Sequence, residues 1–212
     1  MSGSRVRPEY SGPPELYYNE SEASKYASNS HIVRIQTEMA ERALELLALP
    51  EEKSAFLLDI GCGTGISGGV LANSGHCWVG LDVSRPMLKL ASEDEEDRDN
   101  MGDFVWTDMG TGVPFRPGTF DGAISISAIQ WLCHANAADQ NPKRRLHRFF
   151  QTLYGCLAKV SCQRADENPV GTTCRGLVTL KSAPSSMVVA VRTGFLQGEA
   201  YGMLVTVNVA AT

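Results

Sequence analysis

Four short, nearly continuous apolar runs stand out in the first three quarters of the chain. They cover residues 55–60, 77–82, 104–107 and 120–127. Runs of this length with few polar interruptions are typical of parallel strands that are buried on both faces. The segments between them carry apolar residues at helical spacing. The pattern therefore predicts an α/β fold with a doubly wound, mostly parallel sheet.

Amphipathic segments flank these strands and predict helices. Residues 30–49 have apolar side chains every three or four positions, with Ser30 as the expected N-cap and Pro50 as the stop. A shorter helix is expected over residues 21–26, so that the two helices form an N-terminal cap on the sheet. A last helix is expected to start at Asn141.

Composition narrows the class of protein. The 212 residues are 43% hydrophobic and 20% charged, which is ordinary for a globular protein. No apolar run approaches the ~20 residues that a bilayer span needs, and the N-terminus lacks a signal-peptide pattern. Six cysteines without ligand-like spacing indicate reduced thiols in an intracellular compartment and no metal site.

The net charge of −5 argues weakly against nucleic acid as a partner, because a local basic face can still bind RNA. Residues 143–148 form such a basic cluster, which either contacts phosphates or is the solvated face of a helix. The acidic run at residues 93–99 is most simply a solvated loop.

A glycine-rich turn follows the first strand. Gly61, Gly63 and Gly65 let the backbone approach a ligand closely. Asp59, just before them, can orient the turn or reach a ligand's ammonium group through water. The alternative is the nucleotide-binding turn of a dehydrogenase.

Two further carboxylates close the next two strands. Asp82 follows the glycines by about twenty residues, where a carboxylate accepts hydrogen bonds from ribose hydroxyls. Asp108 follows the third strand, where it can accept from an adenine amino group. Each Asp alone is more often a helix cap or a loop anchor. Together with the glycine turn, they indicate S-adenosylmethionine as the cofactor.

Several stretches together resemble the eukaryotic small-subunit (18S) ribosomal RNA guanine-N7 methyltransferase family, which belongs to the Rossmann-like class I methyltransferases. The match covers about residues 13–159, and its most specific part is Ser-Ile-Ser-Ala-Ile-Gln-Trp-Leu-Cys at 125–133, which generic methyltransferases lack. The matching stretches are Glu-Leu-Tyr-Tyr at 15–18, Lys-Tyr at 25–26, Arg-Ala-Leu-Glu-Leu-Leu at 42–47, 57–65, Gly-Leu-Asp at 80–82, Asp-Met-Gly at 108–110 and 124–133.

The resemblance implies N7-methylation of a guanosine in small-subunit pre-rRNA during ribosome biogenesis, in the nucleus and nucleolus and also the cytoplasm. It also implies a small zinc-containing activator subunit that adds its own strand to the exposed sheet edge, and no membrane. Two alternatives stay open. One is a catalytically inactive or truncated ribosome-assembly factor, and the other is a small-molecule or protein methyltransferase.

The expected site lies after the glycine turn and after the fourth strand. Guanine N7 has a free lone pair, so the reaction needs positioning rather than a general base. The candidate catalytic residues are Ser125, Ser127 and Trp131, and Trp131 either stacks on the guanine or is core. Tyr17 and Tyr26 either fold over the cofactor or pack against the sheet. The expected cofactor-binding residues are Tyr26, Asp59, Gly61, Cys62, Gly63, Gly65, Asp82, Val83, Asp108, Met109 and Ser125.

The resemblance ends near Lys159, where the family continues with a fifth strand, a helix and a closing antiparallel pair. Lys-Val-Ser at 159–161 is what a translated splice donor encodes, so one hypothesis is that residues 160–212 derive from an intron and the sheet has four strands. The other is a diverged ending with strands at 176–180, 187–191 and 203–207. The expected division is a flexible arm (1–14), an S-adenosylmethionine-binding methyltransferase domain (15–159) and an atypical C-terminal segment (160–212).

Overall fold

A mixed six-stranded sheet forms the centre of the molecule, with strand order β3-β2-β1-β4-β5-β6. The computed structural model describes residues 7–50, 53–93, 102–135, 140–158, 187–196 and 200–209. Strands β1 to β4 pair in parallel, whereas β5 runs antiparallel to both β4 and β6. The predicted mostly parallel α/β fold is thereby confirmed. The strands are β1 (Phe56–Ile60), β2 (Cys77–Asp82), β3 (Gly102–Trp106), β4 (Gly122–Ile126), β5 (Met187–Leu196) and β6 (Ala200–Val209).

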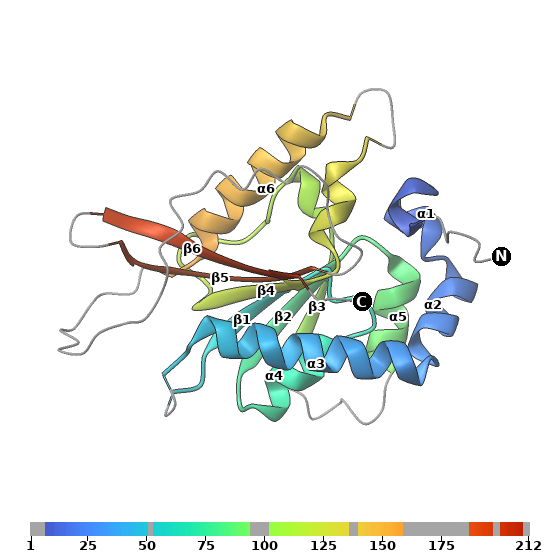
Figure 1. Ribbon diagram of the computed structural model, residues 1–212, viewed down its shortest axis with the longest axis horizontal. Helices are drawn as coiled ribbons and strands as arrows, with labels where there is room; N and C mark the ends of the chain where they lie inside the picture. Colours follow the sequence, from blue (N-terminus) through green and yellow to red (C-terminus); the bar gives the residue numbers. More distant parts are fainter. Residues whose placement is uncertain are drawn as a thin grey trace.

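Helices cover both faces of this sheet, with α3 and α4 on one face and α6 on the other (Figure 1). Because side chains alternate along a strand, neighbouring residues of β1 enter different layers. Leu57 packs with the α3 side, and Leu58 packs with the α6 side. The helices are η1 (Pro8–Tyr10), α1 (Pro14–Tyr17), α2 (Glu20–Ala27), α3 (Ser30–Leu47), α4 (Ile66–Asn73), α5 (Arg85–Glu93), η2 (Met109–Thr111), η3 (Ile129–Cys133) and α6 (Pro142–Cys156).

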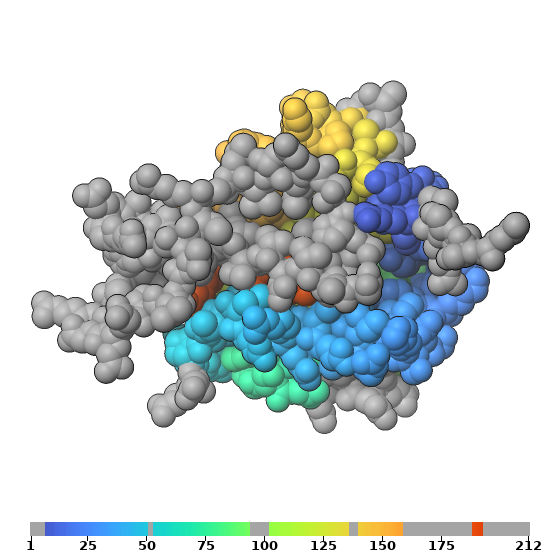
Figure 2. All heavy atoms as spheres, viewed as in Figure 1, coloured from blue at the N-terminus to red at the C-terminus, as the bar shows by residue number. Residues whose placement is uncertain are grey.

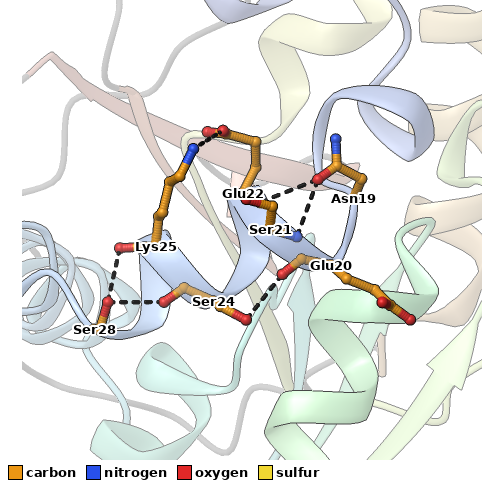
Figure 3. A network of polar contacts seen from close by, with 7 residues as sticks. All are labelled: Asn19, Glu20, Ser21, Glu22, Ser24, Lys25 and Ser28. Atoms are coloured by element: carbon orange, nitrogen blue, oxygen red, sulfur yellow. Dashed lines mark hydrogen bonds and ion pairs between the residues drawn. The ribbon is translucent and has the colours of Figure 1, made fainter.

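The N-terminal helices are capped by residues that lie one or two positions before the serines that open the predicted ranges. Asn29, not Ser30, caps α3, because its side-chain oxygen accepts hydrogen bonds from the backbone N–H groups of His31 and Ile32 at 3.1 and 3.2 Å. Asn19 caps α2 in the same way, and Figure 3 shows its oxygen bonded to Ser21 and Glu22. Asparagine was overlooked in both places because a serine one or two residues later also fits the cap pattern.

The N-terminal segment is partly packed against the domain. Pro8–Tyr10 form a short 3₁₀ helix, and the ring of Tyr10 lies 4.7 Å from that of His134. In Figure 2 the dark-blue N-terminal residues accordingly lie against the yellow segment around η3. Residues 8–10 are thus packed against the domain, and the division into three regions stays a prediction.

The C-terminal strands lie where β4 would otherwise be a sheet edge. The expected strands at 187–191 and 203–207 fall within β5 and β6, whereas 176–180 lies outside the described residues. Leu157, which precedes β5 in the sequence, forms an isolated parallel bridge with Phe120 just before β4. The sheet has six strands rather than four, and the intron origin of the ending stays a hypothesis.

Candidate functional site

A cavity of about 280 Å³ lies at the carboxyl ends of the parallel strands. In open α/β sheets this is the edge at which ligands bind. Nine of the expected site residues line it: Tyr26, Gly61, Gly63, Asp82, Val83, Asp108, Met109, Ser127 and Trp131. The other four, Asp59, Cys62, Gly65 and Ser125, are not part of its wall.

The glycine turn is held against the end of β2. The backbone N–H of Gly61 donates to the carbonyl of Leu81 at 2.7 Å, and the N–H of Gly63 donates to Asp82 Oδ2 at 3.0 Å. Gly61 has φ +74°, and a Cβ there would lie 2.2 Å from the Cβ of Ala128. Only glycine therefore allows the turn to pass this closely beneath the residues that follow β4.

Asp82 faces the cavity with hydrogen-bonding capacity to spare. Its Oδ1 accepts from the N–H of Ser84 at 2.7 Å, and its Oδ2 accepts from Gly63. Burial raises the pKa of this carboxyl, an effect that the N–H groups of Ser84, Gly63 and Val83 partly offset. A carboxylate has about four acceptor positions, so further donors from a ligand can bind it.

Asp59, before the turn, and Cys62, within it, do not line the cavity. Asp59 is 1% exposed, and its Oδ2 accepts from the hydroxyl of Ser67 on α4 at 2.5 Å. Burial raises the pKa of Asp59 to about 7, although the Ser67 hydrogen bond lowers it and Asp82 raises it further. Burial also raises the pKa of the Cys62 thiol, so it stays protonated and is no nucleophile.

The two serines at the end of β4 have different surroundings. Ser125 is 2% exposed, and its hydroxyl donates to the carbonyl of Ile60 at 2.9 Å, which ties β4 to β1. Ser127 lines the cavity in the left-handed region, with φ +55°. Its buried hydroxyl has no hydrogen-bond partner among the described residues. Such strain in a non-glycine residue is characteristic of functional sites.

Aromatic side chains close one side of the cavity. Trp131 is 6% exposed, and its ring lies 5.9 Å from that of Tyr17 and 5.8 Å from that of Tyr18. Tyr18 and Tyr26 line the cavity, and burial raises the pKa of both, so they remain neutral phenols. Trp131 thus packs against neighbours and also faces the cavity.

Asp108 has a structural partner that the sequence pattern did not reveal. Its oxygens lie 2.7 and 2.8 Å from one guanidinium nitrogen of Arg145, and its Oδ1 also accepts from the N–H of Gly110 at 2.8 Å. Arg145 belongs to the basic cluster on α6. This member of the cluster is therefore engaged at the cavity, while Arg144 and Arg148 line an adjoining hollow that Arg145 and Asp108 also border.

Fifteen of the lining residues were not among the expected site residues, and four polar ones matter most here: Glu9, Tyr18, Gln130 and Arg145. Tyr18 and Gln130 lie within stretches that carried the family resemblance, but neither has a residue type that marks chemistry by itself. Glu9 lies in the segment expected to be flexible. No local pattern in the sequence pointed to it.

Metal and membrane sites are absent from the described parts of the chain. There, no three His, Cys, Asp or Glu residues are grouped so that they could hold a metal ion. None of the described helices combines the length and the apolar character that crossing a bilayer requires.

Comparison with known proteins identifies the domain. Residues 57–153 match the family model "Methyltransferase domain". The 18S rRNA (guanine-N(7))-methyltransferase of Mus musculus is 56% identical over 159 residues, which are 75% of this chain and 55% of that protein. The 18S rRNA (guanine(1575)-N(7))-methyltransferase of Saccharomyces cerevisiae is 53% identical over 154 residues, covering 72% of this chain and 54% of that protein. The chain thus spans about half the length of the curated relatives it matches.

Solved structures agree on the fold. A putative S-adenosyl-L-methionine-dependent methyltransferase of Methanococcus maripaludis superposes with a TM-score of 0.51 at 17% identity, covering 75% of this chain and 64% of that one. At this identity the likeness shows the fold alone. The resemblance found in the sequence is confirmed: residues 57–153 are a methyltransferase domain, and about three quarters of the chain is homologous to the 18S rRNA guanine-N7 methyltransferases.

Proposed function

We propose that this chain carries the cofactor-binding part of an S-adenosylmethionine-dependent methyltransferase that modifies N7 of a guanosine in small-subunit rRNA. The observation that carries the proposal is the cavity at the carboxyl ends of β1, β2 and β4. It lies in a domain that is homologous to the 18S rRNA guanine-N7 methyltransferases. Its wall combines a close-packed glycine turn, a carboxylate with spare acceptor positions and a tryptophan.

The cavity wall fits the cofactor. Asp82 would accept hydrogen bonds from the ribose hydroxyls, and the turn at Gly61 and Gly63 would hold the amino-acid part of the cofactor. Asp108 and Met109 would hold the adenine, and Arg145 fixes the carboxylate of Asp108. Cys62 and Gly65 belong to the turn without lining the cavity, and Asp59 links the strand before the turn to α4 through Ser67. When bound, S-adenosylmethionine supplies a methyl group on a positively charged sulfur.

The remaining residues have a positioning task. Because N7 of neutral guanine carries a free lone pair, no side chain has to remove a proton. Trp131 stacks on the base, and Ser127 presents its hydroxyl to the bound molecules. Ser125 acts indirectly, by tying β4 to β1. Water exclusion and alignment then lower the barrier.

The free side of β3 is the site for the activator subunit. Among the described strands β3 pairs with β2 alone, so its outer edge offers backbone groups to a strand from a partner. Trp106 on this strand is 55% exposed, and the Arg85 guanidinium lies 3.8 Å from its ring centre. The partner is the small zinc-containing activator, and the place of action is the nucleolus.

Calorimetric titration of S-adenosylhomocysteine into the purified chain tests the cofactor site. Asp82→Ala should weaken binding by roughly 100-fold, because it removes hydrogen bonds to a charged group. Asp103→Ala, at an exposed position on β3, is the matched control and should bind like the parent. Absence of binding to the parent chain would contradict the proposal. Mapping of N7-methylguanosine in rRNA then separates this enzyme from an assembly factor without catalysis.

A further inference from the structure

Glu9 places a carboxylate in the cavity wall. The side chain is 4% exposed and lines the cavity. No ion pair joins it to another described residue, and its carboxylate oxygens are not among the fully buried atoms that lack a partner. Arg145, a cation on the same wall, is bound to Asp108. Buried carboxylates are normally paired, so the arrangement calls for a ligand that brings donors.

Gln130 supplies a second acceptor in the same cavity. This side chain on η3 is also 4% exposed, and its buried Oε1 has no hydrogen-bond partner among the described residues. It lines the cavity together with Glu9, although the two come from opposite ends of the domain sequence. Two acceptors therefore face the space next to Trp131.

We propose that Glu9 selects guanine by accepting hydrogen bonds from its N1–H and 2-amino groups, with Gln130 as a further acceptor for the amino group. This inference rests on the proposed function. These donors lie on the edge of the base opposite N7. A guanine held by that edge therefore directs N7 away from Glu9, within a cavity that Asp82 and the glycine turn also line.

The chemistry of the other bases explains the selectivity. Adenine has an acceptor at N1 and a carbon-bound hydrogen at C2, so a carboxylate there meets repulsion and no donor. Inosine keeps N1–H but lacks the 2-amino group. Sites built to hydrogen-bond a substrate group discriminate strongly against analogues that lack it, because buried polar atoms are then left unpaired.

The charge of Glu9 also favours the transfer itself. The lone pair of N7 forms the new bond to the methyl carbon while the carbon–sulfur bond breaks and its electrons stay on sulfur. No proton leaves, so the guanine ring gains a positive charge. A carboxylate beside N1 interacts more strongly with this developing charge than with the neutral base, which is the condition for catalysis.

The cofactor offers one rival donor, its ammonium group, and the test separates the two ligands. The 212-residue chain is first titrated with S-adenosylhomocysteine and then, when saturated, with the 5′-monophosphates of guanosine, inosine and adenosine. The parent should bind the guanosine nucleotide roughly tenfold more tightly than the other two. Glu9→Gln should lose about tenfold in guanosine affinity and most of this preference, with unchanged S-adenosylhomocysteine affinity.

Two further variants control this experiment. Glu15→Gln changes the same residue type at an exposed position nearby and should behave like the parent. Gln130→Met keeps the volume but removes the acceptor, and it should reduce the preference for guanosine over inosine several-fold. Thermal unfolding of Glu9→Gln should match the parent, because the substitution keeps the size and shape of the side chain.

The failures are distinguishable. A parent chain that does not bind S-adenosylhomocysteine contradicts the proposed function. If it binds but shows no preference for guanosine over inosine, only the role of Glu9 is overturned. That role is equally overturned if Glu9→Gln retains the preference, or if its S-adenosylhomocysteine affinity falls with guanosine affinity, since the carboxylate then serves the cofactor's ammonium.

Discussion

The carboxyl ends of the parallel strands and the contact between β4 and β5 differ in what they bury: polar atoms without partners in the first region, and apolar side chains in the second. At the strand ends, Asp59, Ser127 and Gln130 each bury a polar atom without a hydrogen-bond partner among the described residues. At the contact between β4 and β5, Val188–Val191 are 1–2% exposed and wholly apolar, and they pack into both layers of the core. The buried polar atoms at the strand ends lower the free energy of unfolding, and the apolar contacts between β4 and β5 raise it.

This contrast shows how a domain can hold a strained site. An unpartnered buried polar group costs roughly 1–3 kcal/mol, whereas a buried aliphatic side chain contributes about as much in favour of folding. Because native proteins are only marginally stable, the cost at the strand ends has to be offset elsewhere in the same cooperative unit. The core layers on either side of β4, to which β5 contributes, are where this occurs.

Breaking the contact between β4 and β5 should have the largest effect. Val189→Asp places a carboxylate in a position that is 2% exposed, and it should destabilise the chain by about 5 kcal/mol in urea unfolding. Leu16→Asp makes a similar change at a residue that is 71% exposed and should cost less than about 0.5 kcal/mol. Equal stability of the two variants would show that β5 does not pack onto β4.

The burial of Asp59 at the strand ends should make the free energy of unfolding depend on pH. The pKa of Asp59 rises from 3.8 to about 7 on folding, so between these values the unfolded chain releases a proton that the folded chain keeps. Stability therefore falls as pH rises through this window, by up to about 4 kcal/mol, and levels off above it.

Asp59→Asn should flatten this slope when urea unfolding is measured from pH 4 to 8. Part of it should persist, because the pKa of Asp82 is raised as well. Asp103→Asn, at an exposed position, should leave the slope unchanged. A slope that survives intact in Asp59→Asn would place the titrating groups elsewhere.

The smallest effect is expected where α3 meets the hairpin. Ala48 ends α3 in the left-handed region with φ 45°, and its carbonyl accepts from Arg192 of β5 at 2.9 Å. Ala48→Gly relieves the backbone strain and should raise stability by about 0.5–1 kcal/mol in thermal unfolding. Ala40→Gly, within α3, should instead lower it by about 1 kcal/mol. A loss at both positions would contradict the left-handed cap.

Strand positions were predicted well where side-chain burial is continuous. The range 77–82 agrees with β2, which is buried between two parallel neighbours. The edge strand β3 starts at Gly102, two residues before the predicted start, because Gly102 pairs with Trp78 without an apolar side chain of its own. Edge strands carry weaker apolar patterns, so their ends are harder to predict.

The candidate site was predicted in part for a similar reason. The glycine turn and Asp82 follow directly from strand ends, and parallel strands bring those ends to one edge. Ser125 and Ser127 could not be told apart from the sequence, since alternation places them on the same side of the strand. Only the left-handed turn at Ser127 redirects that residue into the cavity.

By itself, the sequence determined the parallel strands β1 to β4, the turn between β1 and α4, the carboxylate after β2 and the family. These follow from local periodicity and spacing, which are set by neighbours along the chain. The tertiary structure alone decided that Glu9, Gln130 and Arg145 share one cavity and that β5 runs antiparallel beside β4. Such contacts join segments far apart in the chain, and the packing that selects them has no local signature.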